Sequence, residues 1–291
     1  KQESDALALE EFAGYCLLRD LTFAKSFFLV GGGANGKTTL IKVFEALFGS
    51  ANVSNLTIQE LTDYNRRFTI IELFGKLANF FADLPAEFIK ETGRFKALTG
   101  GDTISGERKF QQGLFSFRPY AKCIFSANTL PEVKDDSDGF FRRVRVIEFP
   151  HTFEENPNFA AALLNPGELS GFLNLAIAGL KRLDKQGHFS GDFAAAENRK
   201  AYRLHSSPEA AFAAACVEET GNQSDFVSTE ELFAAFAAFC NREHLSLKDC
   251  AVFIKRLRFH IPTAVPGRQR VGSQRQMGYR GIRLIGTDNV P

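Results

Sequence analysis

Residues 31–38 hold glycines, a lysine and a threonine at the spacing of a phosphate-binding loop. They read Gly-Gly-Gly-Ala-Asn-Gly-Lys-Thr and match the pattern G-x-x-x-x-G-K-[ST]. In such a loop the glycines let backbone N–H groups curl around phosphate oxygens, Lys37 reaches the terminal phosphates and Thr38 holds Mg²⁺. A nucleoside triphosphate site is therefore predicted. Its members are Gly31, Gly33, Ala34, Asn35, Gly36, Lys37, Thr38 and Thr39.

The loop alone does not name the reaction, because kinases, GTPases and motor ATPases all use it. A second acidic element must complete the Mg²⁺ shell and polarise water, and it commonly ends a neighbouring strand. Our candidate is Asp83, directly after the apolar run 77–82, with a helix N-cap before Pro85 as the alternative. Asn128 follows the apolar run 121–126 and could contact the γ-phosphate or orient the attacking water. Taken alone, it reads as a turn asparagine.

Two adjacent arginines, Arg142 and Arg143, follow the loop 131–139 and precede another apolar stretch. Planar guanidinium groups at this place could reach a γ-phosphate across a subunit boundary and stabilise charge on the transferring phosphoryl group. The alternative is a surface salt bridge, which would be preferred without the other motifs. The pair is a candidate arginine finger only in combination with the phosphate loop.

Buried strands must position these side chains. Apolar runs lie at 26–30, before the phosphate loop, and at 77–82, 121–126 and 143–149. Runs that are apolar on both faces are typical of a parallel sheet covered by helices. A helix is expected from residue 36 to 48, with its positive end directed at the phosphates. The predicted fold class is α/β, with a P-loop core around a parallel sheet.

Other elements frame this core. Helices are expected at 6–18, 59–63, 85–98 and 167–184, and a hairpin at 103–117 with its turn near 111–113. Polar residues at 187–192 and a break at 206–208 indicate a hinge. We therefore expect a helical lead-in (1–20), an ATPase core (21–150), a helical lid or linker (151–204) and a second domain (205–291).

The second domain has three expected helices, at 209–220, 229–242 and 247–259, and then a glycine-broken, β-prone tail. Three helices followed by a basic β-hairpin are the layout of a winged helix. In that layout the third helix is offered to a DNA groove and the hairpin forms the wing. A C-terminal winged-helix domain is therefore predicted.

Charge is distributed unevenly along the chain. Its net charge is +1, but residues 250–287 hold eight lysines and arginines and no acid, which leaves the rest at −7. Such a basic patch is typical of binding to a nucleic-acid backbone. The alternative, a merely solvated tail, fits less well because apolar residues interleave the charges. The DNA-binding candidates in this segment are Lys255, Arg256, Arg258, Arg268, Arg270 and Arg275.

Composition excludes several classes of protein. No stretch approaches the roughly 18 consecutive apolar residues that span a bilayer, and nothing at the start of this sequence resembles a secretory signal. We expect a soluble, cytoplasmic protein without a membrane partner. Five scattered cysteines without a C-x-x-C pair argue against a zinc site and a disulfide scaffold. Because the chain opens with Lys1 rather than Met, we expect that it is trimmed, and a primase domain could precede it.

The ordered motifs of residues 10–150 resemble the superfamily 3 helicases. They are Gly-Tyr-Cys-Leu (14–17), the phosphate loop, Leu-Ala-Asn (77–79), Lys-x-x-Thr-Gly-Gly-Asp (96–102), Phe-x-Phe-x-Pro (115–119), Ser-Ala-Asn-x-x-Pro (126–131) and Gly-Phe-Phe-Arg-Arg-x-x-x-Ile-x-Phe (139–149). More narrowly, the chain is similar to the helicase part of phage, plasmid and poxvirus primase-helicases. Residues 205–285 resemble the winged-helix tail of that group only loosely.

The resemblance implies an AAA+-type ATPase core that assembles into a hexameric ring and moves along single-stranded DNA. It makes Lys37 and Thr38 the ligands of ATP phosphate and Mg²⁺, and Asp83 the Walker B acid that shares the metal. It makes Asn128 the sensor, while Arg143 with Arg142 supplies the finger in trans.

The resemblance also assigns a DNA-tracking role to the hairpin at 103–119. This hairpin would project into the ring channel, where Arg108 and Lys109 follow the DNA backbone. One departure from the family is that Ala82 precedes a single Asp83, where two adjacent acids are common. The group that activates the attacking water is therefore unassigned.

Several functions fit these features. The leading hypothesis is an ATP-driven DNA helicase or translocase in the replication of a phage, plasmid or other mobile element, acting on single-stranded and duplex DNA. The runner-up is an initiator that uses ATP to bind and melt an origin without processive unwinding. A winged-helix regulator whose nucleotide site only switches its assembly belongs to another class. A small-molecule kinase is the weakest alternative, since nothing suggests an acceptor pocket.

Overall fold

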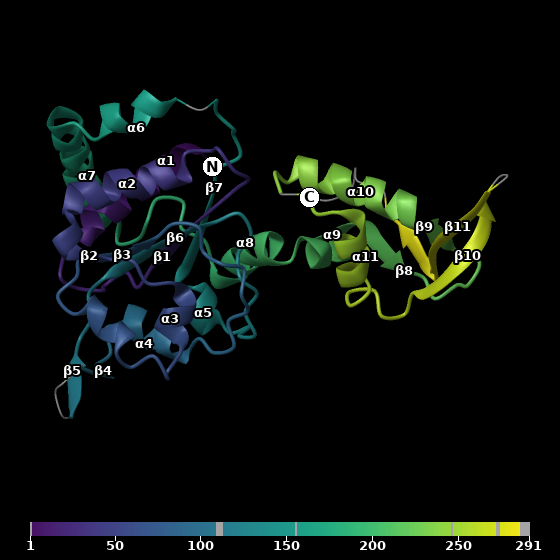
Figure 1. Ribbon diagram of the computed structural model, residues 1–291, viewed down its shortest axis with the longest axis horizontal. Coiled ribbons are helices and arrows are strands. Elements are labelled where there is room, and N and C mark those ends of the chain that lie inside the picture. Colours follow the sequence, from purple (N-terminus) through teal and green to yellow (C-terminus); the bar gives the residue numbers. More distant parts are fainter. Residues whose placement is uncertain (1, 109–112, 155, 246, 272–273, 286–291) are drawn as a thin grey trace. The chain divides into compact units, whose positions relative to one another are not determined.

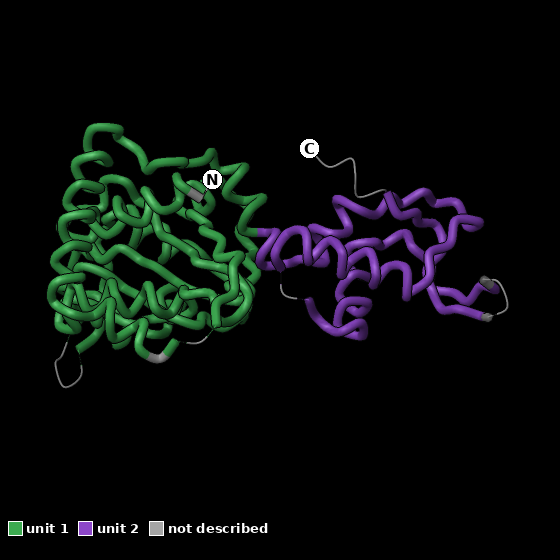
Figure 2. The backbone as a smooth tube through the Cα atoms, turned by 90° about the horizontal axis from the view of Figure 1, so that it is seen from above, with its two compact units in different colours: residues 1–202 green, residues 203–291 purple. Residues whose placement is uncertain are grey.

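A computed structural model describes residues 2–108, 113–154, 156–245, 247–271 and 274–285. The chain divides into two compact units, residues 1–202 and residues 203–291 (Figure 2).

The first unit is built on a five-stranded sheet with the order β2-β3-β6-β1-β7. All of its neighbouring strands pair in parallel, which confirms the predicted parallel sheet. The strands are β1 (Ser26–Val30), β2 (Val53–Ser54), β3 (Ala78–Phe81), β6 (Lys122–Ala127) and β7 (Val144–Glu148).

Helices cover both faces of this sheet (Figure 1). Strand β1 shows why, because Phe27 and Leu29 enter one apolar core while Phe28 and Val30 enter the other. On one face lie α1 (Gln2–Cys16), α2 (Lys37–Phe48) and α7 (Pro166–Gln186), with α6 (Pro157–Leu163) beside α7. On the other lie α3 (Ile58–Thr62), α4 (Gly93–Gly100), α5 (Asp138–Phe141) and α8 (Ala195–Ser206). Two 3₁₀ turns, Ser50–Asn52 and Thr69–Leu73, complete the unit.

Helices α1 and α7 pack at unusually close range. A Cβ atom added to Gly14 would stand 2.2 Å from the Ala176 carbonyl oxygen, and one added to Gly179 would stand 2.6 Å from the Glu10 backbone. The buried Glu11 carboxylate accepts hydrogen bonds from Arg182 Nε and the Ser190 hydroxyl, both at 2.6 Å. Glycine contacts and a satisfied buried carboxylate therefore lock the two helices together.

The helix expected at 85–98 is wrong in its first half, since α4 begins only at Gly93. Residues 85–92 form no helix. Ile89 donates its backbone N–H to the Glu132 carbonyl oxygen at 2.8 Å and forms a parallel bridge with Val133. The backbone groups that a helix needs are thus taken by a distant segment.

The expected hairpin is confirmed as β4 (Ile104–Glu107) and β5 (Leu114–Phe117), which pair antiparallel. It extends away from the sheet (Figure 1). Most of its predicted turn, together with Lys109, lies outside the described residues. Gly106 is required in β4, because an added Cβ would stand 2.6 Å from the Arg67 carbonyl oxygen.

The second unit contains α9 (Pro208–Cys216), α10 (Thr229–Arg242) and α11 (Cys250–Leu257), and the basic tail folds as the hairpin β10 (Val265–Val271) and β11 (Gln274–Arg280). Strand β9 (Phe226–Ser228) extends the hairpin, while β8 (Val217–Glu219) pairs with β12 (Ile282–Leu284). The three helices are confirmed, but α9 stops before residue 217 because the chain there pairs with β12. The rings of Phe236 and Phe253 stack in the core, 4.1 Å apart.

All five cysteines are free thiols, and four of them are buried, as expected of core residues. Among the described residues, no helix has both the length and the apolar character needed to cross a bilayer.

Candidate functional site

The phosphate loop runs from the end of β1 to the start of α2. Gly31 has φ 151°, and an added Cβ would stand 2.4 Å from the Phe149 carbonyl oxygen, so this position admits only glycine. Gly36 has φ 88° and a left-handed backbone. Gly33 has no atom within 4 Å of an added Cβ. Both glycines that the pattern fixes, Gly31 and Gly36, are therefore required by the geometry of the loop itself, whereas Gly33 is not.

Asn35 braces the loop, a role that the sequence analysis did not assign. Its Nδ2 donates to the Gly32 carbonyl oxygen at 2.8 Å and to the Phe149 carbonyl oxygen at 3.1 Å. Its Oδ1 accepts from Lys37 Nζ at 2.8 Å. The side chain thus ties the loop to the chain that leaves β7. The only signal in the sequence is an amide at a position where the motif accepts any residue.

The ammonium group of Lys37 is buried and fully engaged. Its Nζ donates to the Gly31 carbonyl oxygen at 2.8 Å and lies 3.5 Å from Asn128 Oδ1. Burial lowers the pKa of Lys37, and the nearby Asp83 carboxylate opposes that shift. Lys37 is thus a cation with little access to water. An anion that enters here could replace the protein oxygens that now accept hydrogen bonds from its ammonium group.

A cleft of about 350 Å³ joins the predicted nucleotide-site residues. It is lined by residues 33–39 of the loop and α2, by Asp83 after β3, and by Asn128 after β6. In a parallel sheet the carboxyl ends of the strands meet at one edge, which is why these residues converge. Asp83 has φ 61°, and its backbone N–H donates to the Ser126 hydroxyl at 3.2 Å. No helix begins there, so the N-cap alternative is wrong.

The two arginines lie at the opposite edge of the sheet. The Ser26 N–H donates to the Arg143 carbonyl oxygen at 2.7 Å, which places the pair at the start of β1 while the phosphate loop follows its end. The five residues of β1 separate the two edges by about 13 Å, at roughly 3.3 Å per residue. The structure therefore does not bring these arginines to the cleft of their own chain.

The two arginines also differ in exposure. Arg142 is exposed, whereas Arg143 is partly buried and donates to the Gly139 carbonyl oxygen at 2.5 Å. Burial and the neighbouring Arg142 lower the pKa of Arg143, and Asp102 opposes the shift. Arg142 is thus available to another molecule, while Arg143 is held by its own unit.

On the β4–β5 hairpin the guanidinium of Arg108 stacks over the Phe115 ring, 3.7 Å from its centroid. Phe74 contacts the same ring edge-on at 4.9 Å and is 51% exposed. Arg108 therefore lies among partly exposed aromatic rings. Proteins that bind single-stranded nucleic acid commonly combine positive charge with aromatic rings on which bases stack.

The predicted DNA-binding arginines of the second unit gather on one face of the β10–β11 hairpin. Arg270 stands directly opposite Arg275, and Arg268 stands opposite Met277. Residues two apart on a strand, and those opposite them, share a face. Arg268, Arg270 and Arg275 are all exposed on that face. Lys255, Arg256 and Arg258 are exposed on and just after α11.

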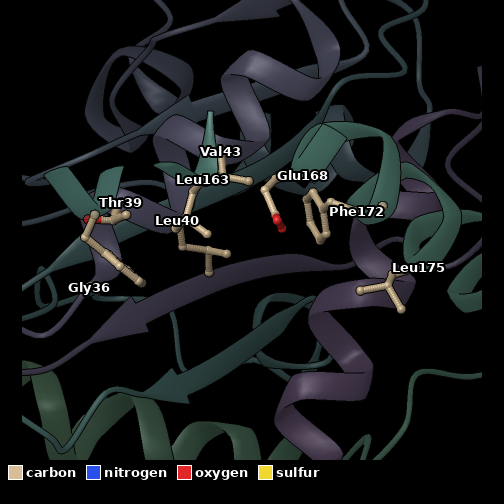
Figure 3. A pocket seen from close by; sticks show the side chains of 10 residues that line it. Gly36, Thr39, Leu40, Val43, Leu163, Glu168, Phe172 and Leu175 are labelled. Carbon is tan, nitrogen blue, oxygen red and sulfur yellow. The ribbon is translucent and has the colours of Figure 1, made fainter. Parts of the chain in front are cut away.

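Two hollows flank the phosphate cleft, and Gly36 lines both. The larger, of about 510 Å³, lies between α2 and the helices α6 and α7 (Figure 3). The smaller, of about 360 Å³, lies between α1 and the chain after β7. Both are lined largely by apolar side chains, which suits the base of a nucleotide whose phosphates occupy the loop.

Comparisons with known proteins extend these findings. A family described as of unknown function (DUF5906) matches residues 29–143. A protein of Acanthamoeba polyphaga mimivirus named "Putative helicase" is 31% identical over 134 residues, 44% of this chain and 14% of that protein. A protein of African swine fever virus named "Putative primase" is 22% identical over 259 residues, 80% of this chain and 27% of that protein. The solved C-terminal region of NrS-1 is 14% identical with a TM-score of 0.48, over 97% of this chain and 72% of that one.

The names of these viral relatives, helicase and primase, agree with the helicase resemblance that the motifs carry. The chain spans 14% and 27% of the length of the two relatives, so it corresponds to a limited part of each.

Proposed function

We propose that this chain is the ATP-driven motor of a DNA helicase that acts in the replication of a phage, plasmid or other mobile element. The observation that carries the proposal is the cleft where the phosphate loop, Asp83 and Asn128 meet at one edge of the parallel sheet. The viral relatives named as helicase and primase support the reaction class.

In this proposal the amides of the loop and Lys37 hold the phosphates of ATP. The Thr38 hydroxyl and the Asp83 carboxylate fit Mg²⁺, which takes oxygen ligands, and both line the cleft. Bound Mg²⁺ would neutralise charge on the phosphates. Asn128, 3.5 Å from Lys37, contacts the γ-phosphate or orients water. Because Ala82 stands where a second acid is common, we expect slow turnover without DNA.

Assembly into a ring follows from the place of the arginines in this scheme. A finger at the edge of the sheet opposite the cleft can serve only the cleft of a neighbouring copy. The exposed Arg142 suits that role better than the partly buried Arg143. We therefore propose a homo-oligomer, with a hexamer as the expected form.

Two surfaces would bind DNA. The aromatic surface with Arg108 suits the single strand, since bases stack on aromatic rings and arginine neutralises phosphate. The second unit, with three helices and an arginine-bearing hairpin, suits a winged-helix domain for duplex DNA, in which α11 enters a groove.

The proposal is tested by measuring ATP turnover with and without single-stranded DNA. Wild-type protein should be stimulated by DNA, and Lys37→Ala should lose turnover while it still binds duplex DNA. The matched control is Lys42→Ala, which removes an exposed lysine from the same helix and should behave as wild type. ATP binding without any DNA-stimulated turnover would instead favour a regulator switched by nucleotide.

A second candidate is an initiator that melts an origin without processive unwinding. The single acid after β3 favours it, because weak hydrolysis suffices for assembly and melting. Strand displacement on a forked substrate separates the two functions, since an initiator hydrolyses ATP and releases little strand.

A further inference from the structure

The larger hollow and the phosphate cleft share two lining residues. Gly36 and Thr39 line both spaces, so a nucleotide whose phosphates occupy the loop can extend its base into the hollow without leaving the protein surface. Leu40, Phe159 and Phe172 offer apolar contact there, and Phe159 is 56% exposed. An exposed phenylalanine at the mouth of a hollow is the kind of surface that a planar base covers.

The hollow also holds an unpaired carboxylate. Glu168 is the third residue of α7, and its backbone N–H donates to Asn165 Oδ1 at 3.0 Å. In the other helices that begin with this pattern, Glu60 and Glu231 close a reciprocal capping box. The Glu168 carboxylate has no partner among the described residues, and Figure 3 shows it between the Phe172 ring and the Leu40 side chain.

The smaller hollow is less suited to read a base. Its Asp5 carboxylate is paired with Arg145 at 2.6 Å, and its Glu148 and His151 also have partners. The polar groups of that hollow are therefore already engaged. Of these two hollows, the larger combines apolar walls with a carboxylate that has no partner in the described part of the chain.

We propose that Glu168 reads the base of the nucleoside triphosphate and selects a base that carries an exocyclic amino group. A carboxylate only accepts hydrogen bonds, so it favours the amino group of adenine, guanine or cytosine and gains nothing from the unsubstituted purine of purine riboside, which has no N–H donor. The proposal rests on the nucleotide site of the proposed function and adds its specificity.

The first test compares binding of ATP, GTP, CTP and purine riboside triphosphate, which lacks the amino group, by calorimetry with Mg²⁺ on the full chain. Wild type should bind at least one of the first three about tenfold more tightly than purine riboside triphosphate. Which of the three it prefers identifies the base. Glu168→Leu should lose this preference, and Glu168→Gln, which keeps an acceptor oxygen, should retain part of it.

The second test fills the hollow. An added Cβ at Gly171 meets nothing within 4 Å, and the residue lies within α7, so Gly171→Leu should fold at least as well as wild type. It should weaken ATP binding at least tenfold. Ala6→Leu, which fills the smaller hollow, and Asp184→Asn, which removes an exposed carboxylate from α7, are the matched controls and should bind as wild type.

The outcomes separate this inference from the proposed function. If no triphosphate binds wild type, the nucleotide site itself is wrong. If ATP binds and Lys37→Ala abolishes binding, yet Glu168→Leu keeps the preference of wild type, only the role of Glu168 is overturned. Loss of binding in Ala6→Leu rather than Gly171→Leu would place the base in the smaller hollow and also overturn it.

Discussion

The phosphate cleft of the first unit and the β10–β11 hairpin of the second both carry positive charge, but they hold it in opposite ways. In the cleft, Lys37 is buried and donates to backbone and side-chain oxygens of its own loop. On the hairpin, Arg270 and Arg275 face each other, exposed and without a partner among the described residues. Under the proposed function the cleft would hold one anion in one place, whereas the hairpin would offer its charge to a polyanion that can bind in many positions.

The difference between one fixed anion and a polyanion explains why the two sites leave different signals in the sequence. A site built for one anion needs a fixed backbone, so its glycines and lysine recur at fixed spacing. A surface for a polyanion needs only density of charge, and its members are recognised from composition. Variants in the cleft, on the hairpin and at Arg142 can test this contrast between a fixed site and a charged surface.

Arg142 gives the strongest test of this contrast. Its side chain is exposed like those of the hairpin arginines, yet we propose that it acts on a fixed phosphate. Arg142→Ala should lower turnover by about 10³-fold or more, as expected for an arginine finger. Mixing Arg142→Ala with Lys37→Ala subunits should recover activity if the finger acts in trans. Failure to recover at every mixing ratio would count against it. Arg143→Ala should mainly lower stability, since Arg143 is bound to Gly139.

The rigidity of the loop is tested by two glycines. Gly31→Ala forces a Cβ to 2.4 Å from the Phe149 carbonyl oxygen and should cost about 3 kcal/mol of folding free energy. Gly33→Ala meets nothing within 4 Å and should change stability by about 0.5 kcal/mol or less. Thermal unfolding measures both. Equal effects would mean that the loop is not as constrained as its geometry implies.

The hairpin is tested by charge removal. The double variant Arg270→Gln/Arg275→Gln should weaken duplex DNA binding and reduce the slope of log K against log[salt] by about two. Removing either arginine should also stabilise the fold by a few tenths of a kcal/mol, because directly opposed like charges repel. Lys42→Gln removes one charge from the first unit and serves as the control. An unchanged salt slope would remove the hairpin from the DNA interface.

The smallest expected effect is on pH dependence. Burial lowers the pKa of Lys37, so its ammonium is lost at a lower pH than that of an exposed lysine. Triphosphate affinity should therefore decline as the pH rises through that lowered pKa. DNA binding by the hairpin should stay constant over the same range, because arginine keeps its charge. Parallel titrations of the two affinities check this, and a joint decline would contradict it.

Much of the fold could be predicted because its signals are local. Strand β1 is apolar from Phe27 to Val30 and buried at every position, and the glycines after it mark the loop. The misassigned stretch 85–92 and the missed strand β8 have a different cause. Both owe their shape to pairing with segments distant in sequence, residues 132–134 and β12, which local periodicity cannot show.

In the candidate site, too, the features with local sequence signals could be predicted, and those that depend on distant residues could not. The position of Asp83 and Asn128 beside the phosphate loop could be predicted because each follows an apolar run. The brace of Asn35 to Phe149 could not, because 114 residues separate the two. Nor could the sequence distinguish the exposed Arg142 from its partly buried neighbour, since both stand side by side before β7.

The tight seam between α1 and α7 has a mechanical consequence. Where Gly14 meets Ala176 and Gly179 meets Glu10, no room is left for one helix to slide or roll on the other. Helices α1 and α7 should therefore move as one rigid body. If the proposed ATP turnover displaces α7, helix α1 would move with it through the same angle, so two segments about 150 residues apart in sequence would respond together.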